Sequence, residues 1–184
     1  MAAAIGIYII VELPGEAGER VRAIQEKYDP KLARLNPPHL TLAGSSGVGS
    51  IPAETTVAAL RAALEPIART TPPMSLALDK PLRFMQTEIV VLPMDPHGPL
   101  RALHERIAKS GLRFKAARFS FTPHVTMSFF PTLTPTVERE LLSVRIAAPA
   151  IIDRFQVYLT RDPQPSKKLL ELPLTGVPGN ANGL

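Results

Sequence analysis

Two short segments of the sequence carry residue types suited to acid–base chemistry. They read Pro38-His39-Leu40-Thr41-Leu42 and Pro123-His124-Val125-Thr126-Met127, and their histidines stand 85 residues apart. Successive side chains of a β-strand point to opposite faces, so each histidine shares a face with the threonine two residues later. Each segment is therefore expected to present an imidazole and a hydroxyl on one side and to anchor itself in the core with the other.

Two imidazoles suit proton transfer at both ends of a displacement at phosphorus. An ordinary histidine titrates near pH 6.5, so at neutral pH one ring can accept a proton while the other donates one. The threonine hydroxyls are compact donors for the non-bridging phosphate oxygens. No acidic cluster has metal-ligand spacing, so we predict neither a metal nor a cofactor. The near two-fold pattern leaves open which histidine is the acid and which is the base.

The elements that must position these segments occur in the same order twice. The first series is expected to be strand 4–12, helix 15–28, strand 39–43, a helix through Val57–Ile67 and strand 74–84. The second series is strand 88–94, a helix from Leu100 ended by Gly111, strand 124–129, a helix from Thr134 to Val144, and strands 151–160 and 168–174. This repeat predicts a single α+β domain with two pseudo-symmetric lobes, residues 1–85 and 86–175. Each lobe would be an antiparallel sheet with helices packed outside, the active-site cleft would lie between them, and residues 176–184 would form a loose tail.

Composition excludes several classes of function. The 184 residues include no cysteine, which rules out a disulfide scaffold, a thiol nucleophile and cysteine-based metal sites. The longest apolar run, Ala2–Val11, is about half the ~20 residues that cross a bilayer, and it lacks the flanks of a signal peptide. We therefore expect a cytoplasmic protein, monomeric and without membrane contact. The net charge of +5 hints at a polyanionic partner.

Three residues outside the two motifs are candidates for substrate binding. Arg118 and Phe121 belong to the basic and aromatic run 113–121 just before His124, a mixture that single-stranded RNA binding uses. A solvated loop with core phenylalanines is the alternative for this run. Tyr8, on the first strand, could reach the cleft or belong to the core. Arg161, Lys167 and Lys168 form either a basic rim or plain surface, 44–50 reads as a mobile rim loop, and His97 and His104 read as ordinary helix residues.

The two motifs resemble those of the 2H phosphoesterases, a family that includes proteins called 2′-5′ RNA ligases and RNA 2′,3′-cyclic phosphodiesterases. The resemblance extends to the first strand ending in "VELP", the run into "FTPHVTM" and the closing "FQVYLTRD", and so covers about residues 4–174. It implies hydrolysis of a 2′,3′-cyclic phosphate, on an RNA end or a small cyclic nucleotide, to a 2′-phosphomonoester, with 2′-5′ ligation as the weak reverse reaction. It further implies His39 as proton donor, His124 as proton acceptor, and Thr41 and Thr126 on the phosphate.

Two other classes of function stay open from the sequence. The chain could be a nucleotide- or RNA-binding module that uses the same cleft without significant turnover. It could also be a structural or interaction protein whose histidines are incidental. Turnover of a cyclic nucleotide would distinguish the enzyme from both of these alternatives.

Overall fold

The computed structural model describes residues 6–95, 97–130, 133–161 and 164–178. The strands are β1 Gly6–Glu12, β2 His39–Ala43, β3 Met74–Leu76, β4 Leu82–Arg83, β5 Val90–Pro93, β6 His124–Ser128, β7 Ala150–Ile152, β8 Arg154–Arg161 and β9 Gln164–Pro173. The helices are α1 Gly15–Tyr28, α2 Pro30–Leu35, α3 Val57–Arg69, α4 Pro99–Ala108 and α5 Pro135–Ser143. The predicted α+β class with antiparallel sheets is confirmed.

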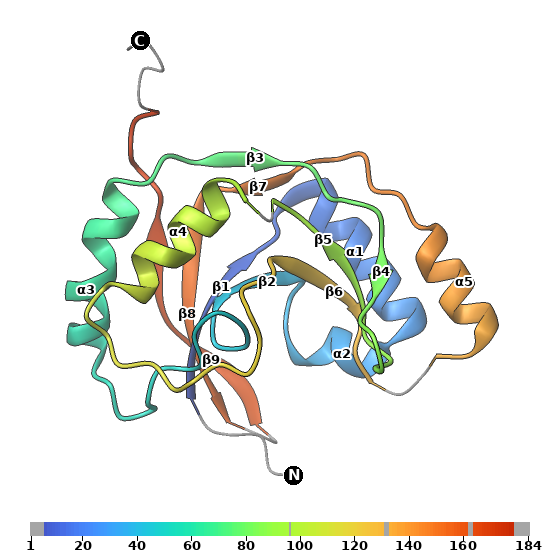
Figure 1. The fold of residues 1–184 in the computed structure, drawn as a ribbon, viewed down its shortest axis with the longest axis horizontal. Helices are drawn as coiled ribbons and strands as arrows, with labels where there is room; N and C mark the ends of the chain where they lie inside the picture. Colours follow the sequence, from blue (N-terminus) through green and yellow to red (C-terminus); the bar gives the residue numbers. More distant parts are fainter. Residues whose placement is uncertain (1–5, 96, 131–132, 162–163, 179–184) are drawn as a thin grey trace.

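The two motif strands are neighbours at the centre of one large sheet. The described strands are ordered β4-β5-β6-β2-β1-β8-β9, and every neighbouring pair is antiparallel. β2 and β6 pair at a single position, where Leu40 stands opposite Val125. β3 and β7 form a separate pair that bridges the two helical flanks at the top of the molecule (Figure 1).

The two halves of the sequence exchange elements within the large sheet. β8 and β9, from the second half, extend the sheet beyond β1, while β4, from the first half, pairs with β5. The helices cross over as well, because α1 follows β1 but packs on β6, and α4 follows β5 but packs on β2. Figure 1 accordingly shows α3 and α4 on one flank and α1, α2 and α5 on the other. The sheet therefore does not divide at residues 85 and 86.

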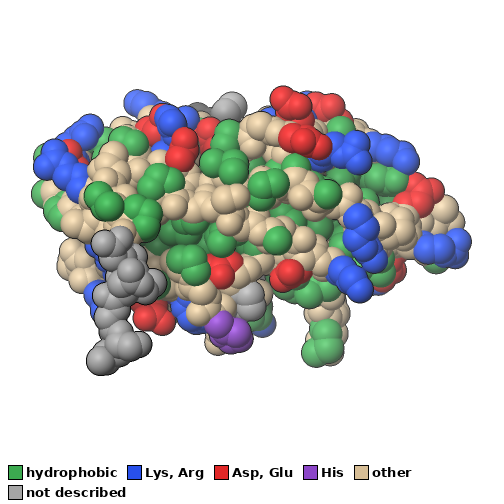
Figure 2. All heavy atoms as spheres, turned by 90° about the horizontal axis from the view of Figure 1, so that it is seen from above, with side chains coloured by type: hydrophobic (Ala, Val, Ile, Leu, Met, Phe, Trp, Pro, Cys, Tyr) green, Lys and Arg blue, Asp and Glu red, His purple; other side chains and the backbone are tan. Residues whose placement is uncertain are grey.

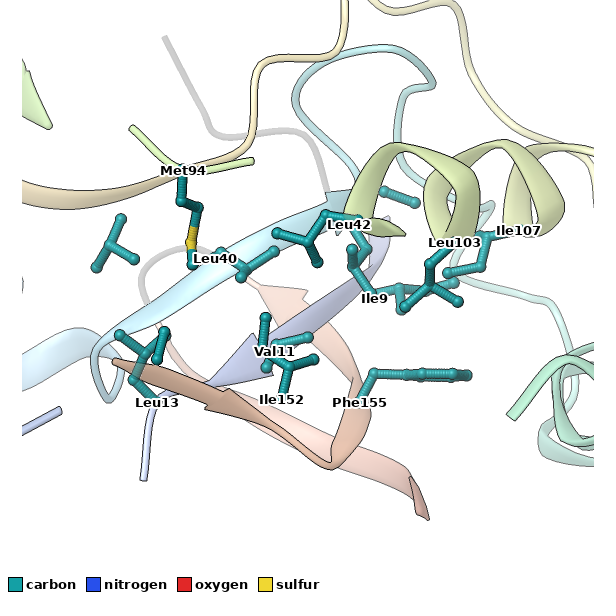
Figure 3. Packing of buried hydrophobic residues seen from close by; sticks show 14 of the residues in the cluster. Ile9, Val11, Leu13, Leu40, Leu42, Met94, Leu103, Ile107, Ile152 and Phe155 are labelled. Carbon is teal, nitrogen blue, oxygen red and sulfur yellow. The ribbon is translucent and has the colours of Figure 1, made fainter. Parts of the chain in front are cut away.

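The core lies on the face of the sheet opposite to the motif histidines. Leu40 and Leu42 of β2 and Val125 and Met127 of β6 are fully buried there, as the alternation of the motifs predicts. Helix α4 closes this region: Leu103 and Ile107 reach toward Leu42, Ile9 and Phe155 (Figure 3). Each motif strand is thus held from behind by apolar packing.

Three expected elements differ from the structure. α2 lies inside the segment expected as a loop, and it begins at Pro30 with Asp29 as its N-cap. The strand expected over 74–84 is two short strands in different sheets, and the strand expected over 151–160 breaks at Asp153 into β7 and β8. In the expected loose tail, the Gly176 N–H donates to the Thr71 carbonyl at 2.9 Å, while residues 179–184 lie outside the described ones.

On the face above the β3–β7 pair, the described basic side chains form no dense patch. In the view from above, hydrophobic side chains are spread over the middle of this face, whereas lysines and arginines lie mainly toward its two ends (Figure 2). This face is therefore a poor candidate for binding a polyanion.

Candidate active site

The four motif side chains form a compact square on one face of the sheet. Because Leu40 stands opposite Val125 in an antiparallel pair, His39 stands opposite Thr126 and Thr41 opposite His124. Directly opposed side chains have Cβ atoms about 5 Å apart. All four line one cleft of about 390 Å³, which we call the histidine cleft. The structure therefore brings together the residues that the motifs predicted.

Both imidazoles are held in the same way. Nδ1 of His39 lies 2.7 Å from the Pro37 carbonyl, and Nδ1 of His124 lies 2.6 Å from the Thr122 carbonyl. A carbonyl only accepts hydrogen bonds, so Nδ1 is the donor in each ring and carries its proton. In the neutral ring, Nε2 then holds the lone pair, which leaves it available for proton transfer.

The prolines before the histidines join each motif strand to its neighbour. The Pro38 carbonyl accepts from the Leu13 N–H at 2.9 Å, and the Pro123 carbonyl accepts from the Met94 N–H at 3.1 Å. Leu13 directly follows β1 and Met94 directly follows β5, so the two bonds occupy equivalent places. Proline fixes its own φ and favours extended backbone in the residue before it, which suits the entry to a strand.

The electrostatic surroundings of the two histidines are not equivalent. Burial lowers the pKa of His39 below its usual 6.5, opposed by the bond to Pro37 and by the negative charge of Glu12. Burial also lowers the pKa of His124, opposed by the bond to Thr122, and the charge of His39 lowers it further. The neighbouring charges thus differ: the carboxylate of Glu12 favours the protonated form of His39, whereas the charge of His39 disfavours the protonated form of His124.

Glu12 is a residue of this site that the sequence did not single out. It stands opposite His39 in the β1–β2 pairing. Its carboxylate accepts a hydrogen bond from the Tyr158 hydroxyl and forms an ion pair with Lys168 at 3.1 Å. Burial, with the bond to Glu12, raises the pKa of Tyr158 to about 12. The available signal was position: "VELP" places a carboxylate at the end of the first strand.

Helix α1 and the Asp29 turn support the second motif strand from the side. The Gln25 side-chain N–H donates to the Thr126 carbonyl at 2.8 Å. The fully buried Asp29 carboxylate accepts from the backbone N–H of Phe129 at 2.8 Å and of Phe130 at 2.9 Å. Both phenylalanines line the histidine cleft directly beyond His124 and Thr126, so Asp29 fixes the far wall of the cleft.

The candidate substrate-binding residues have different locations. Tyr8 lines the histidine cleft. Phe121 does not: it is 4% exposed and stacks on His104 with ring centres 3.8 Å apart, which corrects the expectation that it contacts substrate. Arg118 is exposed and lies over the ring of Phe119, 5.5 Å from its centre. Phe119, two residues before Phe121, is the exposed ring of this segment.

The structure also shows the contacts of the 44–50 loop, of His104 and of the basic residues near the C-terminus. The 44–50 loop is tied to the basic run, because the N–H of Gly47 donates to Phe119 and that of Gly49 donates to Lys115. His104 is buried and hydrogen-bonds the Leu42 carbonyl through Nδ1. Lys168 joins the Glu12 network, Lys167 is exposed, and the side chain of Arg161 lies outside the described ones.

Two kinds of feature are absent from the described part of the chain. Among these residues, no three or more histidine, aspartate or glutamate side chains gather where they could hold a metal ion. No helix within the same residues is long and apolar enough to span a bilayer.

Comparisons with known proteins agree with this arrangement. The family model of the 2′-5′ RNA ligase superfamily matches residues 13–164. Among solved structures, TT0787 of Thermus thermophilus is similar with a TM-score of 0.65 and 21% identity, and E. coli LigT complexed with phosphate with 0.57 and 20%; each match covers 93% of this chain and 98% of the other. E. coli LigT complexed with 3′-AMP is similar with a TM-score of 0.54, 20% identity and the same coverage. No match was found among the curated proteins.

Proposed function

The chain belongs to the 2′-5′ RNA ligase superfamily of 2H phosphoesterases, and we propose that it hydrolyses 2′,3′-cyclic phosphate ends of RNA or of small nucleotides to 2′-phosphomonoesters. The observation that carries this proposal is the square of His39, Thr41, His124 and Thr126, with both rings held through Nδ1. Solved structures of similar fold include E. coli LigT complexed with phosphate and with 3′-AMP, which supports a nucleotide ligand for this cleft.

In the proposed reaction the cyclic phosphate lies between the two threonine hydroxyls. Nε2 of His124 takes a proton from water as the water oxygen forms its bond to phosphorus. The bond between phosphorus and the ribose 3′-oxygen breaks, and Nε2–H of His39 donates its proton to that oxygen. Charge that develops on the non-bridging oxygens is stabilised by Thr41 and Thr126. A 5′-hydroxyl in place of water would form a 2′-5′ linkage by the same steps.

His39 is assigned as donor because Glu12 favours its protonated form, whereas the charge of His39 disfavours protonation of His124. Since the two histidines supply both proton transfers, the proposed reaction requires no metal. A cytoplasmic location and a monomeric state stay predictions from the sequence.

Turnover of a cyclic nucleotide in EDTA tests the proposal. We expect a 2′,3′-cyclic nucleotide to be converted to the 2′-phosphomonoester, followed by phosphorus NMR. The absence of turnover, with both cyclic mononucleotides and short cyclic-ended RNAs, would contradict the enzyme and favour a binding module. Turnover that EDTA abolishes would contradict the metal-free mechanism.

Removing either motif imidazole is expected to abolish most of the activity. His39→Ala and His124→Ala should each lower kcat by about 10²-fold or more, because each removes one proton-transfer group. His97→Ala is the matched control, since His97 is exposed and does not line the histidine cleft. Urea unfolding curves establish that the variants are folded. A loss of less than about threefold in either motif variant would rule out the two-histidine mechanism.

A further inference from the structure

A second hollow of about 510 Å³ adjoins the histidine cleft. His124, Thr126 and Phe129 line both, so the two hollows meet at the second motif strand. We call it the aromatic pocket, because the rings of Phe84, Phe119 and Phe129 line it, together with Met85 and Ile89. All four motif residues line the histidine cleft, whereas the aromatic pocket is lined by His124 and Thr126 of the second motif.

Three apolar side chains of the aromatic pocket are exposed to solvent. Met85 is 90% exposed, Phe119 66% and Phe129 50%. Single exposed apolar residues are common on proteins, but neighbouring ones that surround a hollow are typical of a ligand site. The occupant expected here has a flat apolar surface.

The walls of the aromatic pocket are held in place by hydrogen bonds. At the tip between β4 and β5, the Phe84 N–H donates to the Ile89 carbonyl at 3.0 Å, and the Thr87 hydroxyl donates to the Phe84 carbonyl at 2.9 Å. The Phe84 ring also meets the His124 ring edge to face, with centres 5.0 Å apart. On the other side, the Phe119 carbonyl accepts from the Gly47 N–H at 2.8 Å. The Phe84 ring is therefore positioned beside His124, and the backbone that carries Phe119 is fixed to the 44–50 loop.

Building on the proposed function, we propose that the aromatic pocket binds the base of the nucleotide that precedes the cyclic phosphate end. The preferred substrate is then an RNA of at least two nucleotides, and a cyclic mononucleotide fills only the histidine cleft. An occupant that spans both hollows needs a phosphate at His124 and Thr126 and a flat ring system next to it. Aromatic side chains stack on any base. The guanidinium of Arg118, above Phe119, adds a positive charge for the phosphate that links the two nucleotides.

Kinetics on substrates of different length test this inference. We expect kcat/KM for a dinucleotide with a 2′,3′-cyclic phosphate end to exceed that for the cyclic mononucleotide of the same terminal base by roughly 5- to 100-fold. Phe119→Ala and Met85→Ala should bring this ratio close to one. Ile151→Ala is the control, because Ile151 is also an exposed apolar residue, at 40%, and lines neither hollow. Equal values for both substrates in the unmodified protein would overturn the inference and leave the proposed function intact, whereas no turnover of either would overturn the proposed function itself.

A binding experiment gives a readout independent of turnover. The chain has no tryptophan, so Phe119→Trp introduces a single tryptophan, excited selectively at about 295 nm or above, into the wall of the pocket. We expect its emission to change on titration with the 2′-phosphorylated dinucleotide and to stay constant with the 2′-phosphorylated mononucleotide. Ile151→Trp should respond to neither. An equal response of the Phe119→Trp protein to both ligands would place the terminal base in this pocket and overturn the inference.

Discussion

At the scale of single residues, the two motif histidines are alike in geometry and unlike in charge environment. Each is fixed through Nδ1 to a carbonyl two residues earlier, so the rings themselves do not distinguish acid from base. The difference comes from Glu12, which stands opposite His39 and whose carboxylate raises the pKa of that ring against the effect of burial. The charge of His39 in turn lowers the pKa of His124.

The pH dependence of activity should report this asymmetry. Because burial lowers the pKa of both histidines, we expect a bell-shaped profile of kcat/KM whose optimum lies below about pH 6.5, the ordinary value for histidine. Glu12→Gln removes a negative charge and so lowers the pKa of His39. The alkaline limb, where the proton donor loses its proton, should therefore move to lower pH, while the acidic limb set by His124 stays in place.

Glu12 also forms an ion pair with Lys168. Burial disfavours the charged form of Lys168, but its bonds to Glu171 and Glu12 outweigh this and raise its pKa, so it stays cationic. Glu12→Asp keeps the negative charge, so its alkaline limb should lie close to that of the unmodified protein. Movement of the acidic limb alone in Glu12→Gln would assign the base role to His39 instead.

At the scale of elements, boundaries with a local cause were predictable from the sequence. β2 begins at His39 as predicted, and β6 begins at His124, because a proline precedes each and apolar residues alternate after it. α5 begins at Pro135 after Thr134, whose hydroxyl accepts from the Val137 N–H at 3.2 Å. Each of these features depends on residues close together in the chain.

Features that depend on distant contacts could not be predicted. Phe119 and Phe121 are two residues apart, so an alternating pattern would place both on the same face. In the structure Phe121 is buried against His104 of α4, whereas Phe119 is exposed. The aromatic pocket combines the 84–89 tip with Phe119 and Phe129, segments whose proximity comes from the sheet order. α2 has only six residues, too few for a helical pattern, although Asp29-Pro30 is a recognisable helix start.

The 44–50 loop offers a test of how its packing holds the site together. Gly47 has a φ of +73°, and a Cβ there would lie 2.3 Å from Nε2 of His104. Gly111 has a similar φ of +85° with nothing within 4 Å of such a Cβ. Alanine at either position should cost about 1–2 kcal/mol for the left-handed backbone. Gly47→Ala should cost about 1–3 kcal/mol more from overpacking.

Urea unfolding of the two glycine variants measures this difference. The free energy of unfolding should fall clearly further for Gly47→Ala than for Gly111→Ala. Equal losses would mean that the His104–Phe121 stack gives way without cost, and the loop would then not be fixed by it.

At the scale of the whole molecule, the exchange of elements makes the two halves of the sequence mutually dependent. β1 is flanked by β2 from its own half and by β8 from the other. Helices α1 and α4 each cover the motif strand of the opposite half. Neither half contains a complete core, although each contains a complete motif.

Separate expression of the two halves should demonstrate this dependence. We expect residues 1–85 alone and residues 86–184 alone to show no cooperative thermal unfolding by circular dichroism, because each lacks the strands and the helix that the other supplies. Co-expressed halves should copurify and unfold in one transition. Cooperative unfolding of residues 1–85 on their own would contradict the interdependence.

The single pairing position between β2 and β6 has a thermodynamic consequence. The backbone pairing of the motif strands is confined to Leu40 and Val125, yet each strand contributes one histidine and one threonine to the same cleft. A phosphate that is hydrogen-bonded by Thr41 of β2 and Thr126 of β6 would act as a non-covalent crosslink across the middle of the sheet. Its binding energy would add to the cohesion of the fold in proportion to the logarithm of ligand concentration. Binding of substrate would then raise the free energy of unfolding of the whole sheet.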